Sequence, residues 1–326
     1  MEIPLLQSQK WEKLQSDLGE TTFFESNQEF QYLAIKKSTP VGSYLYLPYG
    51  PVLAKNSAAK NAFKALMTLA KQENAIFIRI EPQNAKIAAK MPKNAIKSHD
   101  LNPADTWILD ISGSDEDFKA KLPSRLLRYH RNAEKNGLTI FTSKNPADIK
   151  YLVDLQQNLA KTKKISTFSE NYLKTELEQD FATLYLVQDG GTKCGENSIF
   201  SDVSETAAAA GPRILAAGLV FDDGTTRYNL QGAQSAEGAK MHATGILTIQ
   251  LILDARAKNL QKFDFWGIAP DGAPKNHPWA GFTSFKKSFG GEAVHYAGTW
   301  DIPVNSAKYR LYQIFRALNR VVRKIK

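Results

Sequence analysis

The sequence predicts an α/β protein built from two similar units, each with a mixed sheet flanked by helices. Two observations carry this prediction: strand-like and helix-like segments alternate along the chain, and one order of segments occurs twice. The composition, with 43% hydrophobic and 23% charged residues, is ordinary for a globular protein that can bury a core. Because 326 residues exceed the usual size of one domain, we expect two.

The first copy of the repeated order lies near the start of the chain. Segments 32–37 and 43–53 alternate aromatic and aliphatic residues with polar ones, which is typical of strands. A helical pattern over 57–74 follows, with apolar positions at helical spacing. An apolar strand over 75–82 then ends at Pro82. The segment therefore predicts two strands, a helix and a third strand.

The second copy has the same order with one more strand in front. Its expected elements are three strands, a helix and a last strand, over 183–189, 213–224, 225–233, 242–259 and 262–270. Pro82 and Pro270 lie 188 positions apart, and Gly50 and Gly232 lie 182 apart. Order and spacing agree, so we infer an internal duplication. Neither copy has a GxGxxG segment or a P-loop, which argues against a dinucleotide or nucleoside-triphosphate fold.

The repeat suggests where the two domains divide. We expect a first domain over 1–145, a second over 146–302, and a C-terminal helix over 303–326 that packs back on the first. That helix carries an apolar stripe at steps of four and three, formed by Leu311, Phe315, Leu318, Val322 and Ile325. Residues 189–212 are a long insertion of small residues between two strands, and this composition favours disorder over a lid.

The formal net charge of +9 comes from two local clusters. Residues 307–326 hold seven basic side chains and no acidic one, and a second basic cluster lies between Lys119 and Lys135. Such clusters are typical of proteins that bind nucleic acid, nucleotide phosphates or an anionic membrane, although a solvated helix face has the same pattern. The candidates for contact with tRNA or an anionic surface are Arg125, Arg128, Arg131, Arg316, Arg320 and Arg323.

The expected compartment is the cytoplasm. The start of the chain lacks the basic and apolar regions of a signal peptide, and no apolar run reaches the roughly 18 residues that span a bilayer. Cys194 is the only cysteine, so an intrachain disulfide is excluded. No histidine has a partner at metal-ligand spacing, and we expect neither a metal nor a cofactor.

Segments along nearly the whole chain, in order, resemble one protein family. They are LQSQKWEKLQSDLG, SYLYLPYGPVL, FIRIEP, TWILDIS, RLLRYHRNAEKNGL, FSENYL, AAGLVFDDGTTRYNLQGAQS, KFDFWGIAP, FTSFKKSFGG and AGTW. The chain is similar to the FemABX family, the non-ribosomal peptidyltransferases that build peptidoglycan cross-bridges. The resemblance implies two acyltransferase (GNAT-like) domains, without the coiled-coil arm of some members. It also implies transfer of an amino acid from aminoacyl-tRNA to a stem-peptide amine.

This implied reaction needs little machinery, because an aminoacyl ester is already activated. The protein has to align ester and amine and to stabilise the oxyanion of the tetrahedral intermediate. In the family a Phe–Lys pair lines the reaction centre, and the resemblance places it at Phe285 and Lys286. The alternative is that Phe285 and Phe289, four residues apart, belong to the core and that Lys286 lies on the surface.

Further substrate contacts follow from the resemblance alone, and each has a plain structural alternative. Lys13 matches a phosphate-contacting lysine or is an exposed helix residue, and Tyr172 matches a substrate-contacting tyrosine or packs in a helix. Tyr228 faces the expected groove or is an ordinary strand tyrosine, and Asp110 is a candidate base or a strand-end aspartate. Phe168 replaces an arginine that contacts the pyrophosphate of a UDP-linked precursor.

Two other functions stay open at this stage. An acyl-CoA-dependent N-acyltransferase would use a glycine-rich turn at a helix start to bind pyrophosphate, but the segment 231–243 lacks the tight pattern. A non-catalytic RNA- or membrane-binding module would use the two basic clusters. For the family reaction we expect a monomer acting on a lipid-linked rather than a UDP-linked precursor, with peripheral contact to the inner face of the membrane.

Overall fold

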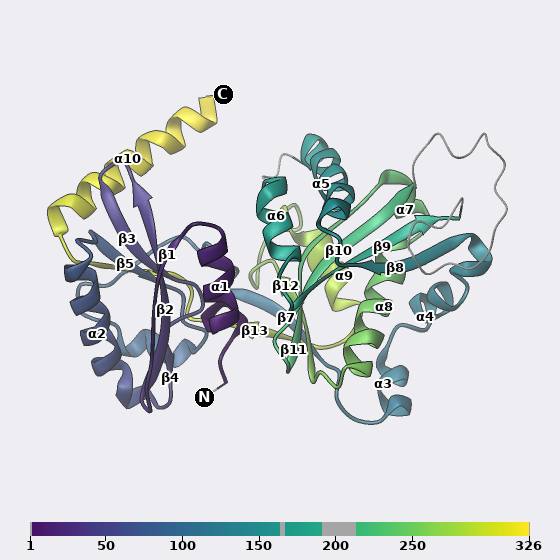
Figure 1. Ribbon diagram of the computed structural model, residues 1–326, viewed down its shortest axis with the longest axis horizontal. Helices are drawn as coiled ribbons and strands as arrows, with labels where there is room; N and C mark the ends of the chain where they lie inside the picture. The colour runs from purple at the N-terminus through teal and green to yellow at the C-terminus, as the bar shows by residue number, and fades with distance from the viewer. Residues whose placement is uncertain (1, 164–166, 191–212, 326) are drawn as a thin grey trace. The chain divides into compact units, whose positions relative to one another are not determined.

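The computed structural model describes residues 2–163, 167–190 and 213–325, and these form two units. Unit 1 comprises Met1–Thr106 and Val294–Lys326, and unit 2 comprises Trp107–Ala293. The insertion expected over 189–212 lies almost entirely outside the described residues. Each unit has a seven-stranded mixed sheet and flanking helices, which confirms the predicted fold class (Figure 1).

Unit 1 is built on a sheet in the order β1-β2-β3-β5-β14-β6, with β4 paired to β2. Its strands are β1 (Thr21–Ser26), β2 (Phe30–Thr39), β3 (Gly42–Leu47), β4 (Val52–Leu53), β5 (Phe77–Ile80), β6 (Ile96–Lys97) and β14 (Trp300–Pro303). Its α-helices are α1 (Gln9–Asp17), α2 (Ala59–Gln72) and α10 (Ser306–Ile325), and short 3-10 turns cover Leu5–Gln7, Asn56–Ala58 and Ala85–Lys90. Helix α2 connects β3 to the parallel strand β5 and buries Ala62, Phe63 and Leu66 against the sheet.

Unit 2 has a sheet in the order β13-β7-β12-β11-β10-β9-β8. Its strands are β7 (Asp105–Asp110), β8 (Leu138–Ser143), β9 (Ala182–Asp189), β10 (Ile214–Asp222), β11 (Thr226–Gln234), β12 (Lys262–Gly267) and β13 (Glu292–His295). The helices are α3 (Asp115–Lys121), α4 (Ser124–Arg131), α5 (Ile149–Lys163), α6 (Glu170–Leu177), α7 (Ala236–Lys240), α8 (Ala243–Ala257) and α9 (Ala280–Lys287). Short 3-10 turns cover Glu134–Asn136 and Pro146–Asp148. Helices α5 and α6 lie on one side of the sheet, and α3, α4 and α8 lie on the other (Figure 1).

The two units repeat one plan, as the sequence predicts. In unit 1, β2 pairs antiparallel with β3, and α2 then connects β3 to the parallel strand β5. In unit 2, β10 pairs antiparallel with β11, and α8 connects β11 to the parallel strand β12. The expected segments are found with their expected types, except that the strand expected over 43–53 is divided into β3 and β4. Helix α8 buries Ile246, Ile249 and Ile252 completely, so it is the core helix that its apolar sequence indicates.

The structure divides the chain elsewhere than the boundaries at 145 and 302. Residues 107–145 belong to unit 2 because β7 and β8 are strands of its sheet and α4 packs against α8. Residues 294–302 belong to unit 1 because β14 pairs with β5 of the first sheet. Sequence periodicity does not show this return of the chain, since the strand 300–303 is only four residues long.

A buried ion pair holds the returning strand in unit 1. Arg79 on β5 and Asp301 on β14 form two hydrogen bonds of 2.7 Å, and their side chains are only 2% and 1% exposed. Burial by itself would lower the pKa of Arg79, but the hydrogen bonds and the charge of Asp301 raise it above its usual range. The pair therefore stays charged inside the unit, where two parallel hydrogen bonds offset the loss of water.

The same pair anchors the start of α10. Tyr309 donates a hydrogen bond of 3.0 Å to Asp301, and Arg79 donates one of 3.4 Å to the hydroxyl of Tyr312. Both tyrosine rings also pack on Phe77, with ring centroids 5.2 and 4.8 Å away. The beginning of the C-terminal helix thus packs on unit 1 through tyrosines, not through the apolar stripe.

The expectation that the apolar stripe covers the first domain is wrong for its described members. Leu311, Phe315 and Leu318 are 45%, 41% and 59% exposed, and the neighbouring Ile314 is 56% exposed. The side chains of residues 319–326 lie outside the described part of the chain. Helical spacing alone predicts that a stripe exists but does not say what covers it.

Breaking the buried pair should destabilise unit 1 strongly. We expect Asp301→Ala to lower the free energy of unfolding by about 3–5 kcal/mol, because it leaves the Arg79 guanidinium buried without a counter-charge. Urea unfolding followed by circular dichroism measures this change. The matched control is Lys13→Ala, which removes the exposed ion pair with Asp17 and should cost less than about 1 kcal/mol. Equal effects of the two substitutions would contradict the assignment.

Candidate functional site

The end of strand β12 makes an unusual turn in unit 2. Trp266 has a positive φ of 64°, a conformation that is strained for a residue with a bulky side chain. The buried carboxylate of Asp264 accepts a hydrogen bond of 2.7 Å from the backbone N–H of Trp266 and so stabilises the turn. As a result, the carbonyl groups of Trp266 and Gly267 lie close to helix α9.

Lys286, in the last turn of α9, binds these carbonyl groups. Its ammonium donates hydrogen bonds of 3.2 Å to the carbonyl oxygen of Trp266 and 2.5 Å to that of Gly267. Burial lowers the pKa of Lys286 to about 8, and the charge of Asp264 opposes this shift. Lys286 is therefore a partly buried lysine that is charged at pH 7 and close to its titration point.

The two lysines of the segment 284–291 have different surroundings. Lys287 is exposed, and its ammonium lies 5.2 Å from the ring centroid of Trp107. Of these two lysines it is therefore Lys287, and not Lys286, that has the character of a surface residue. The core contact expected in the structural alternative is present, because Phe285 packs against the buried Phe289 with ring centroids 5.1 Å apart.

Tyr228 lies beside the same turn because β11 and β12 run parallel. The register places Tyr228 opposite Asp264, and its ring contacts that of Trp266 edge-to-face at 6.2 Å. Its hydroxyl donates a hydrogen bond of 2.7 Å to Asp223, and the side chain is 6% exposed. The structure thus brings two predicted residues, Tyr228 and Lys286, into contact with Trp266.

Phe285 faces a cavity of about 340 Å³ in unit 2. The walls come from α4, α9, the end of β11 and the start of α8, and they include Arg125, Tyr129, Gln234, His242, Phe285 and Ser288. Neighbouring residues of a helix point about 100° apart, so Phe285 lines the cavity while Lys286 points to the β12 turn. The cavity and the β12 turn therefore border neighbouring sides of α9.

One wall of this cavity is a stacked pair of rings beside basic side chains. Tyr129 stacks on His242 with centroids 4.5 Å apart and an interplanar angle of 8°. Arg125 donates a hydrogen bond of 2.9 Å to the Tyr129 hydroxyl, and the guanidinium of Arg128 lies 5.8 Å from the same ring. His242 adopts a positive φ of 57° just before α8 begins. Aromatic faces next to guanidinium groups are suited to a base and its phosphate.

The predicted basic residues divide between the two units. Arg125, Arg128 and Arg131 are exposed on α4 of unit 2, whereas Arg316 lies on α10 of unit 1 and is partly buried. The side chains of Arg320 and Arg323 lie outside the described residues. Only the α4 group therefore belongs to the same unit as Lys286.

Lys13 and Asp110 form side-chain contacts within their own units. Lys13 is exposed on α1 of unit 1 and forms an ion pair of 2.6 Å with Asp17. Asp110 accepts hydrogen bonds of 2.9 and 2.6 Å from the backbone and the hydroxyl of Ser112, which is the arrangement of a strand-end aspartate. These observations favour the structural alternatives for both residues.

Tyr172 lies on α6, one turn after Phe168 and one turn before Glu176. Its ring stacks on the 51% exposed Phe168 at 4.7 Å. Burial raises the pKa of Glu176 to about 8, and a hydrogen bond with Tyr172 opposes the shift. The Phe168–Tyr172 pair therefore presents an aromatic surface at the start of α6.

Trp266, Tyr129 and His242 could not be identified from sequence as parts of a site. The positive φ of Trp266 has no sequence signal. Tyr129 and His242 are 113 positions apart and meet only because α4 packs against α8. Among the described residues no group of His, Cys, Asp and Glu side chains is arranged to hold a metal ion.

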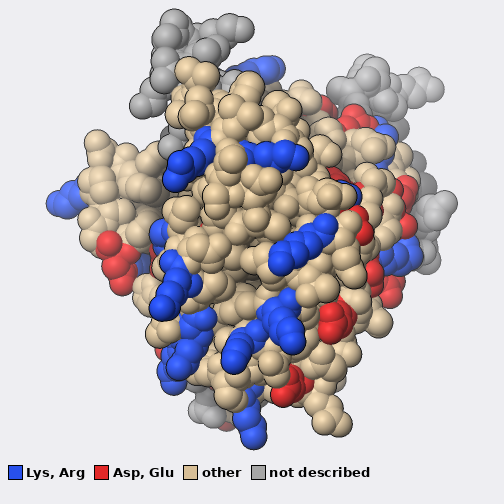
Figure 2. Space-filling model, turned by 90° about the vertical axis from the view of Figure 1, so that its left-hand side faces the viewer, with Lys and Arg blue, Asp and Glu red and all other residues tan. Residues whose placement is uncertain are grey.

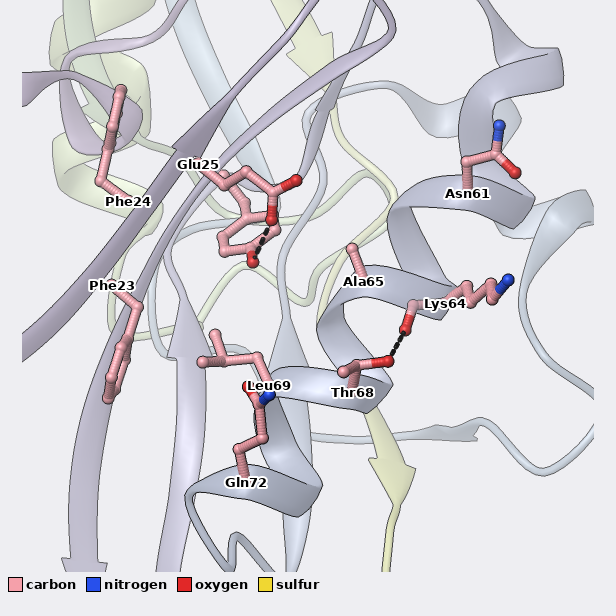
Figure 3. A pocket seen from close by; sticks show the side chains of 10 residues that line it. Phe23, Phe24, Glu25, Asn61, Lys64, Ala65, Thr68, Leu69 and Gln72 are labelled. Atoms are coloured by element: carbon pink, nitrogen blue, oxygen red, sulfur yellow. Dashed lines mark hydrogen bonds between the residues drawn. The ribbon is translucent and has the colours of Figure 1, made fainter.

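A larger cavity of about 720 Å³ lies in unit 1 between β1, β2 and α2 (Figure 3). Burial raises the pKa of Tyr32 there, and the hydrogen bond of 2.6 Å that Tyr32 donates to Glu25 adds to this shift. Lys64 and Thr68 of α2 line the other side. None of the residues predicted from sequence lines this cavity, so its size alone does not make it the candidate site.

Comparisons with known proteins identify the family and the fold. The model of the FemAB family matches residues 149–317, which is more than half of the chain. FemX superimposes with a TM-score of 0.76 and 18% identity, over 94% of each chain. The C-terminal domain of a putative lysylphosphatidylglycerol synthetase from Agrobacterium fabrum reaches a TM-score of 0.56 at 12% identity, over 94% of this chain and 91% of that one. L-PGS from Bacillus licheniformis reaches 0.54 at 14% identity, over 90% and 92%. No curated protein matches the sequence.

At these identities the structures show a shared fold, and the family model covers the Lys286 turn, Tyr172 and Tyr228 within one match. The resemblance seen in the sequence segments is thereby confirmed. The chain belongs to the FemAB family.

Proposed function

We propose that the protein is an aminoacyltransferase that moves an amino acid from aminoacyl-tRNA to the stem-peptide amine of a peptidoglycan precursor. Family membership supports the reaction class. The observation that carries the proposal is Lys286, a charged group with a lowered pKa held by two backbone carbonyls at a strained strand end. Perturbed and strained groups of this kind are concentrated at functional sites.

In the proposed reaction, the neutral stem-peptide amine attacks the carbonyl carbon of the aminoacyl ester. A C–N bond forms, and the carbonyl oxygen becomes an oxyanion. The C–O bond to the ribose then breaks, and the proton lost by the amine is taken up by the ribose oxygen. Two of the three N–H groups of Lys286 bind the carbonyls of Trp266 and Gly267, which leaves one to donate to the oxyanion.

The cavity beside Phe285 is the proposed site for the end of the donor tRNA. The stacked rings of Tyr129 and His242 offer a face for a base, and Arg125 and Arg128 offer positive charge for phosphates. Because Phe285 and Lys286 are adjacent on α9, a nucleotide in this cavity would place its ester near the ammonium. An acyl-CoA donor would place its pyrophosphate at the start of α8, which lines the same cavity. Turnover with charged tRNA, and none with acetyl-CoA, would identify tRNA as the donor.

The proposed acceptor is a lipid-linked precursor, bound near Tyr172 and Tyr228. Phe168 lies just before α6, where the resemblance implies an arginine for the diphosphate of a UDP-linked precursor. Without this contact a precursor already concentrated on a membrane is the better substrate, since the surface supplies the local concentration. Only the sequence resemblance suggests that Lys13 and Asp110 contact the substrate. In the structure Lys13 pairs with Asp17, and Asp110 accepts hydrogen bonds from Ser112.

Removing the Lys286 ammonium should slow turnover without unfolding the protein. We expect Lys286→Ala to lower kcat by one to three orders of magnitude, because removal of one oxyanion donor typically costs about 10²–10³ in rate. The measurement is the mass increase of lipid-linked precursor incubated with charged tRNA. The matched control is Lys287→Ala, which changes the adjacent exposed lysine and should keep the parent rate. A Lys286→Ala rate within twofold of the parent would exclude the role.

The rate enhancement that Lys286 provides should depend on pH. Its lowered pKa of about 8 means that the ammonium is charged at pH 7 and mostly neutral at pH 9 and above, where it stabilises an oxyanion less well. We therefore expect the ratio of the parent rate to the Lys286→Ala rate to be largest below pH 8 and to shrink above it. Taking the ratio cancels the ionisation of the attacking amine, which both proteins share. A ratio constant from pH 6.5 to 9.5 would speak against a charged lysine.

Placing a positive charge at position 168, just before α6, should change the acceptor preference. We expect Phe168→Arg to lower the KM for the UDP-linked precursor by roughly one to two decades, the value of one charge-assisted phosphate contact of about 1.5–3 kcal/mol. The side chain at 168 is 51% exposed, so an arginine fits without disturbing the core. Steady-state kinetics with both precursors measure the effect, and Phe168→Gln controls for loss of the ring. An unchanged KM would place the diphosphate elsewhere.

A further inference from the structure

Helix α10 exposes a stripe of large apolar side chains. Leu311, Ile314, Phe315 and Leu318 are 45%, 56%, 41% and 59% exposed. Since successive residues advance by about 100° around a helix, these four fall within an arc of about 100°. The buried Tyr309 and the partly buried Tyr312 point to the other side, toward Phe77. The apolar stripe therefore faces away from the sheet that anchors the helix.

Basic side chains flank this stripe on both sides. Lys308 and Arg310 are exposed and fall on opposite edges of the apolar arc. The sequence 307–326 contains seven basic residues and no acidic one. Such a distribution, with apolar residues on one face and lysine or arginine at its edges, is typical of helices that lie in a membrane surface.

A cavity of about 320 Å³ lies at the base of α10 and shares Arg310 with the edge of the stripe. Lys93 and Arg310 line it together with polar and apolar residues, and its lining includes no acidic side chain. Ile96, also part of this lining, is 41% exposed. Figure 2 shows one face of unit 1, on which Lys and Arg side chains are prominent over Asp and Glu. A ligand with negative charges would be attracted to this surface.

We propose that α10 docks unit 1 on an anionic phospholipid surface, with the Leu311–Leu318 stripe inserted among the acyl chains and Lys308 and Arg310 at the headgroups. A second copy of the chain would also cover apolar side chains, but it would bring like charges together across the interface. A nucleic acid would satisfy the charges and leave the apolar stripe in water. An anionic lipid surface satisfies both, and no described helix is long and apolar enough to cross the membrane itself.

The proposal goes beyond the transfer reaction, because docking on lipid requires neither tRNA nor precursor. It also assigns the apolar stripe a function that a purely electrostatic contact would not give it. The test is flotation of the full chain with phosphatidylglycerol–phosphatidylcholine vesicles that contain no precursor, compared with pure phosphatidylcholine vesicles. We expect binding to the anionic vesicles that weakens, but does not vanish, at high salt.

Matched variants separate insertion from charge attraction. Leu311→Ser should weaken binding to the anionic vesicles about three- to tenfold, and Leu311→Ser with Phe315→Ser at least tenfold. The control is Leu101→Ser, which removes a leucine with the same 45% exposure from another part of unit 1 and should leave binding unchanged. Thermal unfolding of each variant verifies that the fold is intact.

Three outcomes would overturn the proposal. Vesicle binding that is equal in the parent and the double variant would mean that charge alone is responsible. Absence of vesicle binding together with a dimer that Leu311→Ser dissociates, measured by sedimentation, would assign the stripe to a second copy. Absence of vesicle binding together with tRNA retardation that Leu311→Ser weakens would assign it to the nucleic acid.

Discussion

The buried pair of Arg79 and Asp301 is the interaction on which the architecture of unit 1 depends. It joins residues 222 positions apart, and neither side chain could stay charged at 1–2% exposure without the other. It fixes β14 beside β5, so the first sheet is complete only after the chain has traversed unit 2. The same carboxylate and guanidinium then bind Tyr309 and Tyr312, which sets the start and direction of α10.

Unit 2 contains a similar buried ion pair, formed within the hairpin of β10 and β11. Arg227 forms two hydrogen bonds of 2.7 Å with Asp222 and is fully buried, and it also donates to the carbonyl of Leu251 in α8. The pair raises the pKa of Arg227, although burial alone would lower it. This fixes β11 against α8, and the parallel pairing of β11 with β12 then aligns Tyr228 with Asp264. The geometry around Lys286 rests on that alignment.

Sequence patterns predicted the elements well because their signal is local. Alternation and helical spacing identified every segment of the two copies, and the repeat predicted two units of one fold. Contacts between distant residues carry no such signal, so the return of β14 and the placement of 107–145 were not predicted. At the site, the Phe285–Lys286 pair came from a family resemblance, whereas the strained Trp266 and the Tyr129–His242 stack depend on tertiary packing. For α10 the stripe was found, but its exposure could not be known from periodicity.

The surroundings of Lys286 explain how a site without metal-ligand clusters in its described residues can favour an oxyanion. Withdrawal of the ammonium from water lowers its pKa to about 8, although the charge of Asp264 opposes the shift. A charge in this condition interacts with a developing negative charge more strongly than a hydrated lysine does, because less water screens it. The carbonyls fix the ammonium beforehand, so little reorganisation is needed when the oxyanion forms. In the proposed reaction, the burial that makes the charged lysine less stable in the free protein is thus the source of its stabilising effect on the intermediate.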